Sequence, residues 1–158
     1  MVDIRLVRID DRLIHGQITS AWISDLGVDT IVVADDGTVK DDLQRMMLEM
    51  ATPPNIILKI FKVEDAAAFL QNPENSGRAL VLVKGPAQAL ALVKKGIFVK
   101  SINVGNLSMH PAKKKIYKSI WVGDDDISNF KELDSLGIEL EVRVVPSDRP
   151  IPLFSLIK

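Results

Sequence analysis

The feature that most constrains the fold of this chain is a regular alternation of short apolar runs with helix-like stretches. Six of the runs are rich in branched residues and are short enough to be buried strands. They cover residues 4–9, 30–34, 55–61, 79–83, 100–104 and 139–144. Because these runs are apolar at nearly every position, they fit a sheet that is covered on both faces.

The stretches between these runs carry apolar residues at helical spacing. One begins at Asp124-Asp125-Asp126, a run that offers an N-cap, and ends before Gly137. A second begins after Gly85-Pro86 and ends at Gly96. A third has an apolar stripe that we expect to pack in the core rather than to line a ligand pocket. That stripe consists of Leu43, Met46, Met47 and Met50.

Strands that alternate with helices predict βαβ units with right-handed crossovers. The expected fold class is therefore α/β, with a single doubly wound, mostly parallel β-sheet and helices on both faces. In such sheets ligands bind beyond the carboxyl ends of the strands, so functional residues are expected just after each strand. Residues 150–158 are expected to be a loop or a docked tail.

Length and composition narrow the function classes. The 158 residues are expected to form one domain, 1–158, and the net charge of -1 gives no reason to expect nucleic acid or an anionic membrane as a partner. No apolar run approaches a membrane span and the first residues do not resemble a signal peptide, so the expected location is cytoplasmic. The chain has no cysteine and only two histidines, so neither a thiolate nor a histidine-rich metal site is expected.

The most informative segment follows the first predicted strand. There the chain continues with Asp10, Asp11 and Arg12, then His15 and the pair Gly16-Gln17, where a helix is expected to begin. An imidazole at a helix N-terminus, with a guanidinium to hold phosphate oxygens and a carboxylate to select one ring tautomer, is what a phosphohistidine site needs. The same residues also fit a capped, salt-bridged turn without chemistry, and spacing alone leaves both interpretations open.

A resemblance favours the first interpretation. Residues 8–17, Arg-Ile-Asp-Asp-Arg-Leu-Ile-His-Gly-Gln, resemble the signature of IIB components of the mannose–fructose–sorbose class of phosphotransferase systems. The similarity continues in order along nearly the whole chain, through residues 31–36, 51–54, 104–106 and 137–143. One departure is Asn106, where many members of the family have a second glycine.

The resemblance implies a phosphocarrier enzyme without cofactor or metal. His15 would accept a phosphoryl group on Nδ1 from a phosphorylated IIA protein and pass it to a sugar entering through membrane IIC and IID components. Such a carrier would be cytoplasmic and peripherally associated with its transporter. Arg12 would bind phosphate, Asp10 (or Asp11) would orient His15, and Gly16 and Gln17 would supply backbone donors. The sugar and the oligomeric state, a homo-oligomer included, stay open.

Several other residues have less definite roles. Asp35 ends a neighbouring strand and fits either a hydrogen bond to the active loop or a helix cap, while Lys84 is expected to be solvated. The alternative function is a receiver-like regulatory domain phosphorylated on aspartate, because Asp10-Asp11, Asp35-Asp36 and Lys84 all follow strands. The order of these residues along the chain differs from that of a receiver, which would also leave His15 without a role.

Overall fold

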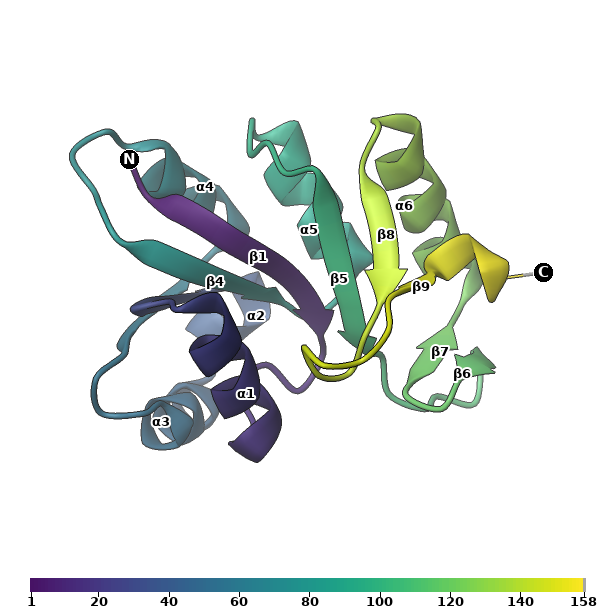
Figure 1. Ribbon diagram of the computed structural model, residues 1–158, viewed down its shortest axis with the longest axis horizontal. Helices are drawn as coiled ribbons and strands as arrows, with labels where there is room; N and C mark the ends of the chain where they lie inside the picture. Colours follow the sequence, from purple (N-terminus) through teal and green to yellow (C-terminus); the bar gives the residue numbers. More distant parts are fainter. Residues whose placement is uncertain (158) are drawn as a thin grey trace.

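The computed structural model describes residues 1–157 and has a seven-stranded sheet with helices on both faces (Figure 1). The strand order is β3-β2-β4-β1-β5-β8-β9, and all neighbours are parallel except β8 and β9. The strands are β1 (Asp3–Asp10), β2 (Thr30–Ala34), β3 (Ile57–Phe61), β4 (Arg78–Val83), β5 (Ser101–Asn106), β8 (Glu139–Val142) and β9 (Ile151–Pro152). The predicted α/β class with a mostly parallel sheet is confirmed.

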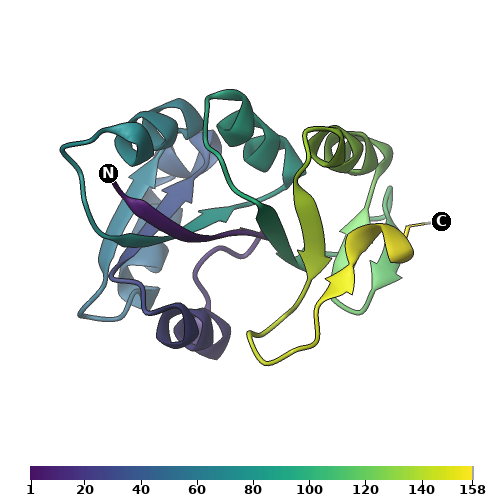
Figure 2. The same ribbon diagram turned by 45° about the horizontal axis from the view of Figure 1, so that its top comes forward.

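The helices lie in two layers. They are α1 (Gly16–Leu26), α2 (Asp36–Val39), α3 (Asp42–Ala51), α4 (Val63–Gln71), α5 (Pro86–Lys94), α6 (Asp124–Ser135) and the short 3-10 helix η1 (Leu153–Ser155). Helices α4, α5 and α6 cover one face of the sheet, whereas α1 and α3 cover the other (Figures 1 and 2). A separate hairpin of β6 (Lys114–Tyr117) and β7 (Ile120–Val122) follows β5.

Alternating side chains of the central strands supply both halves of the core. In β2, Val32 belongs to the apolar cluster on the face covered by α4, α5 and α6, whereas Ile31 and Val33 belong to the cluster on the other face, with Trp22 of α1 and Leu48 of α3. Both faces are therefore buried, which explains why the strands are apolar at nearly every position. None of the helices formed by residues 1–157 is long and apolar enough to cross a membrane.

The chain reverses direction beside β1. From β1 it crosses over α1 to β2 on one side, and from β5 it continues through the hairpin and α6 to β8 on the other side. A crevice at the carboxyl ends of such a strand pair is where α/β sheets bind ligands. The His15 loop begins at this point, directly after Asp10.

The prediction that the methionine stripe packs in the core is wrong. Leu43, Met46, Met47 and Met50 of α3 are 53–80% exposed, and Leu48 is the only buried residue of this helix. Helical spacing identifies a face as apolar but does not determine which neighbour covers it. Here the face that meets the sheet is the one that carries Leu48, and the stripe faces outward.

The start of α6 and the C-terminal tail differ slightly from the predictions. The N-cap of α6 is Gly123 rather than Asp124, and Asp126 accepts a hydrogen bond from the Gly123 N–H at 2.9 Å. The tail is docked, because β9 pairs with β8 and Leu153 is fully buried. Residue 158, part of the predicted tail, lies outside the described residues.

Candidate active site

The His15 loop is held in place by two apolar side chains. Leu13 and Ile14 are buried against Trp22 and Leu48. Leu13 has a φ of 59°, in the left-handed region, which costs about 1–2 kcal/mol for a residue with a Cβ. Burial of a leucine side chain contributes about 1.5–3 kcal/mol, enough to offset that cost. The loop therefore has a defined shape even though it connects a strand to a helix.

Asp10 is the centre of the site. Its side chain is fully buried, and both of its oxygens accept hydrogen bonds. Oδ1 accepts from the Arg12 backbone N–H at 3.0 Å and from Arg12 Nε at 3.1 Å. Oδ2 accepts from a terminal nitrogen of Arg8 and one of Arg12, both at 3.1 Å, and lies 2.9 Å from His15 Nε2. One carboxylate thus fixes two guanidinium groups and the imidazole.

These contacts keep Asp10 ionised. Burial alone would raise the pKa of its carboxyl, but the hydrogen bonds from His15 and Arg12 and the charge of Arg8 outweigh burial and lower the pKa to about 2. A carboxylate accepts hydrogen bonds and donates none. In the neutral imidazole, therefore, Nε2 of His15 carries the proton and Nδ1 carries the free lone pair.

His15 is also the N-cap of α1. Its backbone N–H donates to Thr19 Oγ1 at 2.9 Å, and its ring is 22% exposed. Within residues 1–157 Nδ1 has no hydrogen-bond partner, so the nitrogen with the lone pair is the one available to a reactant. Asp10 thus fixes the Nε2 edge of a ring that is partly exposed.

Arg12 and the first residues of α1 surround the ring. The Arg12 side chain is 38% exposed and uses Nε and one terminal nitrogen for Asp10, which leaves its other terminal nitrogen without a partner in the described chain. Gly16 and Gln17 are exposed and form the first turn of α1, where backbone N–H groups are unsatisfied and favour an anion. Gly16 has a φ of 52°, which favours glycine.

Asp11, the alternative partner for His15, points elsewhere. Its carboxylate accepts hydrogen bonds from Asn106 Nδ2 at 2.8 Å and from the backbone N–H and Oγ of Ser108 at 2.7 and 2.9 Å. Asp11 therefore ties the His15 loop to the loop that follows β5. Asn106, the position that departs from the family pattern, acts as a donor in this connection.

Asp35 and Lys84 form a separate cluster. Asp35 caps α2, and its Oδ2 accepts from the backbone N–H and the hydroxyl of Thr38 at 2.9 and 2.7 Å. Lys84 Nζ lies 3.8 Å from Asp35 Oδ2 and donates to Gln44 Oε1 at 3.2 Å. Of the two roles considered for Asp35, its hydrogen bonds correspond to the helix cap.

Beneath the site lie Arg8, whose place in the motif is explained by an ion pair with a loop aspartate, and three residues for which no role was predicted. Arg8 is buried and paired with Asp10, and behind it lie Asn103 of β5, Glu141 of β8 and Arg143. A polar residue inside an apolar strand, such as Asn103 between Ile102 and Val104, was the available sign of a buried contact.

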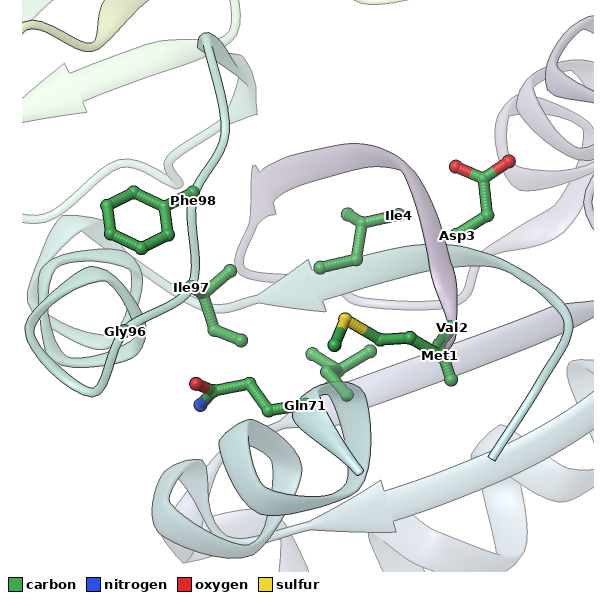
Figure 3. Close-up of a pocket in the computed structure, with 9 residues that line it drawn as sticks. Met1, Val2, Asp3, Ile4, Gln71, Gly96, Ile97 and Phe98 are labelled. Carbon is green, nitrogen blue, oxygen red and sulfur yellow. The ribbon is translucent and has the colours of Figure 1, made fainter. Parts of the chain in front are cut away.

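A pocket of about 490 Å³ lies at the opposite end of the strands, where β1 and β5 begin (Figure 3). Its lining includes Met1, Ile4, Gln71, Ile97 and Phe98. Its lining is largely apolar and includes no histidine. The His15 loop is therefore the better candidate for the active site. Within residues 1–157 no three His, Asp or Glu side chains cluster as a metal site.

Comparison with known proteins gives consistent matches. The sequence profile described as "PTS system sorbose subfamily IIB component" matches residues 4–158. The sorbose-specific EIIB component of Klebsiella pneumoniae is 34% identical over 157 residues, which are 99% of this chain and 96% of the relative. The mannose-specific EIIAB component of Escherichia coli K12 is 34% identical over 155 residues, 98% of this chain and 48% of the relative. The crystal structure of the IIBSor domain of the Klebsiella pneumoniae sorbose permease superposes with a TM-score of 0.94, at 34% identity, covering 98% of this chain and 96% of that one.

Proposed function

Because this chain belongs to the sorbose subfamily of phosphotransferase-system IIB components, we propose that it carries a phosphoryl group on Nδ1 of His15. The observation that supports this most directly is the contact of His15 Nε2 with Asp10 Oδ2 at 2.9 Å. That contact leaves Nδ1 as the nucleophilic nitrogen of a ring that is partly exposed. The site needs no cofactor or metal for this reaction.

The first proposed step is an in-line displacement at phosphorus. The Nδ1 lone pair forms a bond to the phosphorus of a phosphohistidine on a IIA protein, and the N–P bond of the donor breaks, its electron pair returning to the donor imidazole. With a phosphoryl group on Nδ1 and the proton still on Nε2, the His15 ring becomes cationic. The Asp10 carboxylate at 2.9 Å stabilises that charge.

The second step transfers the group to the sugar. A sugar hydroxyl oxygen attacks the phosphorus, the bond to Nδ1 breaks, and the hydroxyl proton is released. Arg12 supplies the charge that binds the phosphoryl oxygens, because one of its terminal nitrogens is not engaged by Asp10. The backbone N–H groups of Gly16 and Gln17 add the partial positive charge of the α1 N-terminus.

The partners follow from this sequence of steps. The donor is a cognate IIA protein, in keeping with the EIIAB name of the mannose-specific relative, and the sugar is presented by membrane IIC and IID components. The chain would then work in the cytoplasm, peripherally at its transporter. Relatives named for sorbose and for mannose are both 34% identical to this chain, so the proposal rests on the carrier step and not on one sugar.

The test is phosphorylation by a phosphoenolpyruvate-driven relay with the IIA protein of a mannose-class relative, run beside that relative's own IIB to show that the donor is active. We expect an acid-labile, alkali-stable label on the wild type. His15→Ala should fold normally and carry no label, because the ring lies at the surface end of the loop. His110→Ala, which removes the other histidine, should be labelled like the wild type.

Two results would contradict the proposal. A label that survives in His15→Ala and is destroyed by alkali would indicate an aspartyl phosphate, as in a receiver domain. A wild-type chain that stays unlabelled while the relative's IIB is labelled by a range of IIA donors would show that His15 is not a phosphoryl acceptor.

A further inference from the structure

Arg8 is a buried cation with a complete set of partners. It is 2% exposed, and one terminal nitrogen donates to Asn103 Oδ1 at 2.6 Å and to the Arg143 carbonyl at 3.0 Å. The other terminal nitrogen donates to Asp10 Oδ2 at 3.1 Å. A buried charge is stable only where it is paired and hydrogen-bonded, so the position of this guanidinium is closely determined.

The space for Arg8 exists because residue 105 is glycine. A Cβ added at Gly105 would overlap the guanidinium carbon of Arg8 and both of its terminal nitrogens. Gly105 is not in the left-handed region, so its backbone conformation is one that any residue adopts. What excludes a side chain at this position is therefore the arginine and not the turn.

The partners of Arg8 extend to three further elements. Asn103 Nδ2 donates to Glu141 Oε1 at 3.2 Å, and Arg143 binds both oxygens of Glu141 at 2.8 and 2.9 Å. The guanidinium carbons of Arg8 and Arg143 lie 5.2 and 5.0 Å from the ring centre of Trp22, in the range of cation–π contacts. Trp22 belongs to α1, the helix that begins directly after His15, so the network joins β1, β5 and β8 to that helix.

We propose that Arg8, admitted by Gly105 and held by Asn103 and the Arg143 carbonyl, is a positioning residue that aims the Asp10 carboxylate at His15 Nε2. The inference rests on the proposed function of His15 for its catalytic consequence. Arg12 is less suited to this role, because its side chain is 38% exposed and its remaining terminal nitrogen is assigned to phosphate. Arg8 is buried and holds Oδ2 toward the imidazole independently of what Arg12 binds.

Gly105→Ala tests this without removing any charged group. The added methyl should displace the Arg8 guanidinium and release Asp10 from its position. In unphosphorylated protein, ring-nitrogen NMR of His15 should change from a single Nε2–H tautomer to a mixture. The single-turnover rate of phosphoryl transfer should fall by about 10- to 100-fold, the size expected for a misplaced reacting group. If Gly105 had only a structural role, Gly105→Ala would not change the tautomer of the His15 ring.

Gly123→Ala is the matched control. Gly123 caps α6 away from the network, and its added Cβ would have no neighbour closer than 3.5 Å. We expect the wild-type tautomer and rate in this variant. The ring signals can be assigned in a His110→Gln background, because the chain has only two histidines.

A double-mutant cycle with Arg8→Lys links the effect to the arginine. A lysine is slimmer and leaves room for the methyl, so adding Gly105→Ala to Arg8→Lys should have a much smaller effect than adding it to the wild type. If Gly105→Ala fails to fold, Arg8→Lys alone is decisive, because lysine keeps the charge but replaces two terminal nitrogens in a fixed plane with a single ammonium nitrogen. Mixed tautomers would support the proposal.

A wild-type tautomer in a folded Gly105→Ala variant, or in Arg8→Lys, would overturn the inference, as would additive effects in the cycle. The NMR measurement needs no phosphodonor. A wild-type chain that shows the single tautomer but takes up no label would contradict the proposed function and leave the positioning role of Arg8 intact.

Discussion

His15 Nε2 lies 2.9 Å from Oδ2 of Asp10, and the same carboxylate oxygen accepts hydrogen bonds from two arginines. The groups that share it differ in exposure, because Arg8 is buried, His15 is partly exposed and Arg12 is more exposed still. A single carboxylate therefore connects the interior of the sheet to the reacting surface, and its partners should respond differently to substitution.

Arg12→Met is expected to lower activity strongly and stability moderately. Asp10 is buried but keeps its contacts with Arg8 and His15 in the variant, so loss of the Arg12 hydrogen bonds should cost about 1–3 kcal/mol of the free energy of unfolding. Loss of the phosphate-binding charge should slow transfer by about 10²-fold, as for removal of one donor that stabilises transition-state charge. Single-turnover transfer and urea unfolding measure the two effects. Arg5→Met, on β1 and 42% exposed, is the control and should change neither. A wild-type transfer rate in Arg12→Met would remove Arg12 from the site.

Asp10→Asn is expected to change how stability depends on pH. The folded pKa of about 2 lies below the reference value of 3.8, so the ionised carboxylate favours the native state. This contribution, on the order of 2 kcal/mol, is present above about pH 3.8 and is lost as the pH falls toward 2. Urea unfolding between pH 2 and 5 should show that decline in the wild type and a shallower one in Asp10→Asn.

The same variant should be less stable at neutral pH. Without the carboxylate, Arg8 stays buried without an anionic partner, which costs about 3–5 kcal/mol. Asp3→Asn, an exposed carboxylate at the start of the same strand, serves as the control. If the free energy of unfolding of Asp10→Asn fell between pH 5 and 2 as steeply as that of the wild type, Asp10 would not be the group whose titration causes the decline.

Asp11→Ala is expected to loosen the loop after β5. The substitution removes the acceptor of three hydrogen bonds from Asn106 and Ser108, which should cost about 1–3 kcal/mol. Amide hydrogen exchange at Ser108 should become faster, whereas His15 should still be phosphorylated, because Asp11 does not contact the ring. Asp134→Ala, exposed on α6, provides the comparison. Unchanged protection of the Ser108 amide would contradict the assigned connection.

Met50→Lys is expected to leave stability unchanged. Met50 is 80% exposed, so its replacement should alter the free energy of unfolding by no more than about 0.5 kcal/mol. Leu48→Ala, two residues earlier on the same helix but buried, should cost about 2–5 kcal/mol. Equal losses in the free energy of unfolding for the two variants would mean that the methionine stripe of α3 is buried.

Six strands could be predicted from the sequence to within about two residues at each end, because short branched runs between glycine, proline and polar residues have few other solutions. The short strands β6, β7 and β9 were not predicted. The reactive segment was also accessible, since Asp10, Arg12 and His15 lie within one loop. The direction of Asp11 was not, because it depends on a loop almost a hundred residues away in sequence. Asn103, Glu141 and Arg143 meet Arg8 only once strand order and register are known.

The methionine stripe and Asp35 also show that a local sequence pattern does not determine which neighbours a residue contacts. Periodicity identified the apolar face of α3 correctly but not its surroundings. Asp35 follows a strand, as site residues in this fold class do, yet a local turn with Thr38 satisfies it. Residue type and place along the chain narrow the candidates, and tertiary contacts decide among them.

The hydrogen bond from Arg8 to the Arg143 carbonyl joins residues 135 positions apart, and this separation bears on how the protein is made. A nascent chain that has released β1 and α1 from the ribosome still lacks β8, so Arg8 cannot be buried with its partners at that stage. Contacts of such long range form late and slow the folding of parallel sheets. The complete arrangement around Asp10 should therefore form only after nearly the whole chain has been synthesised.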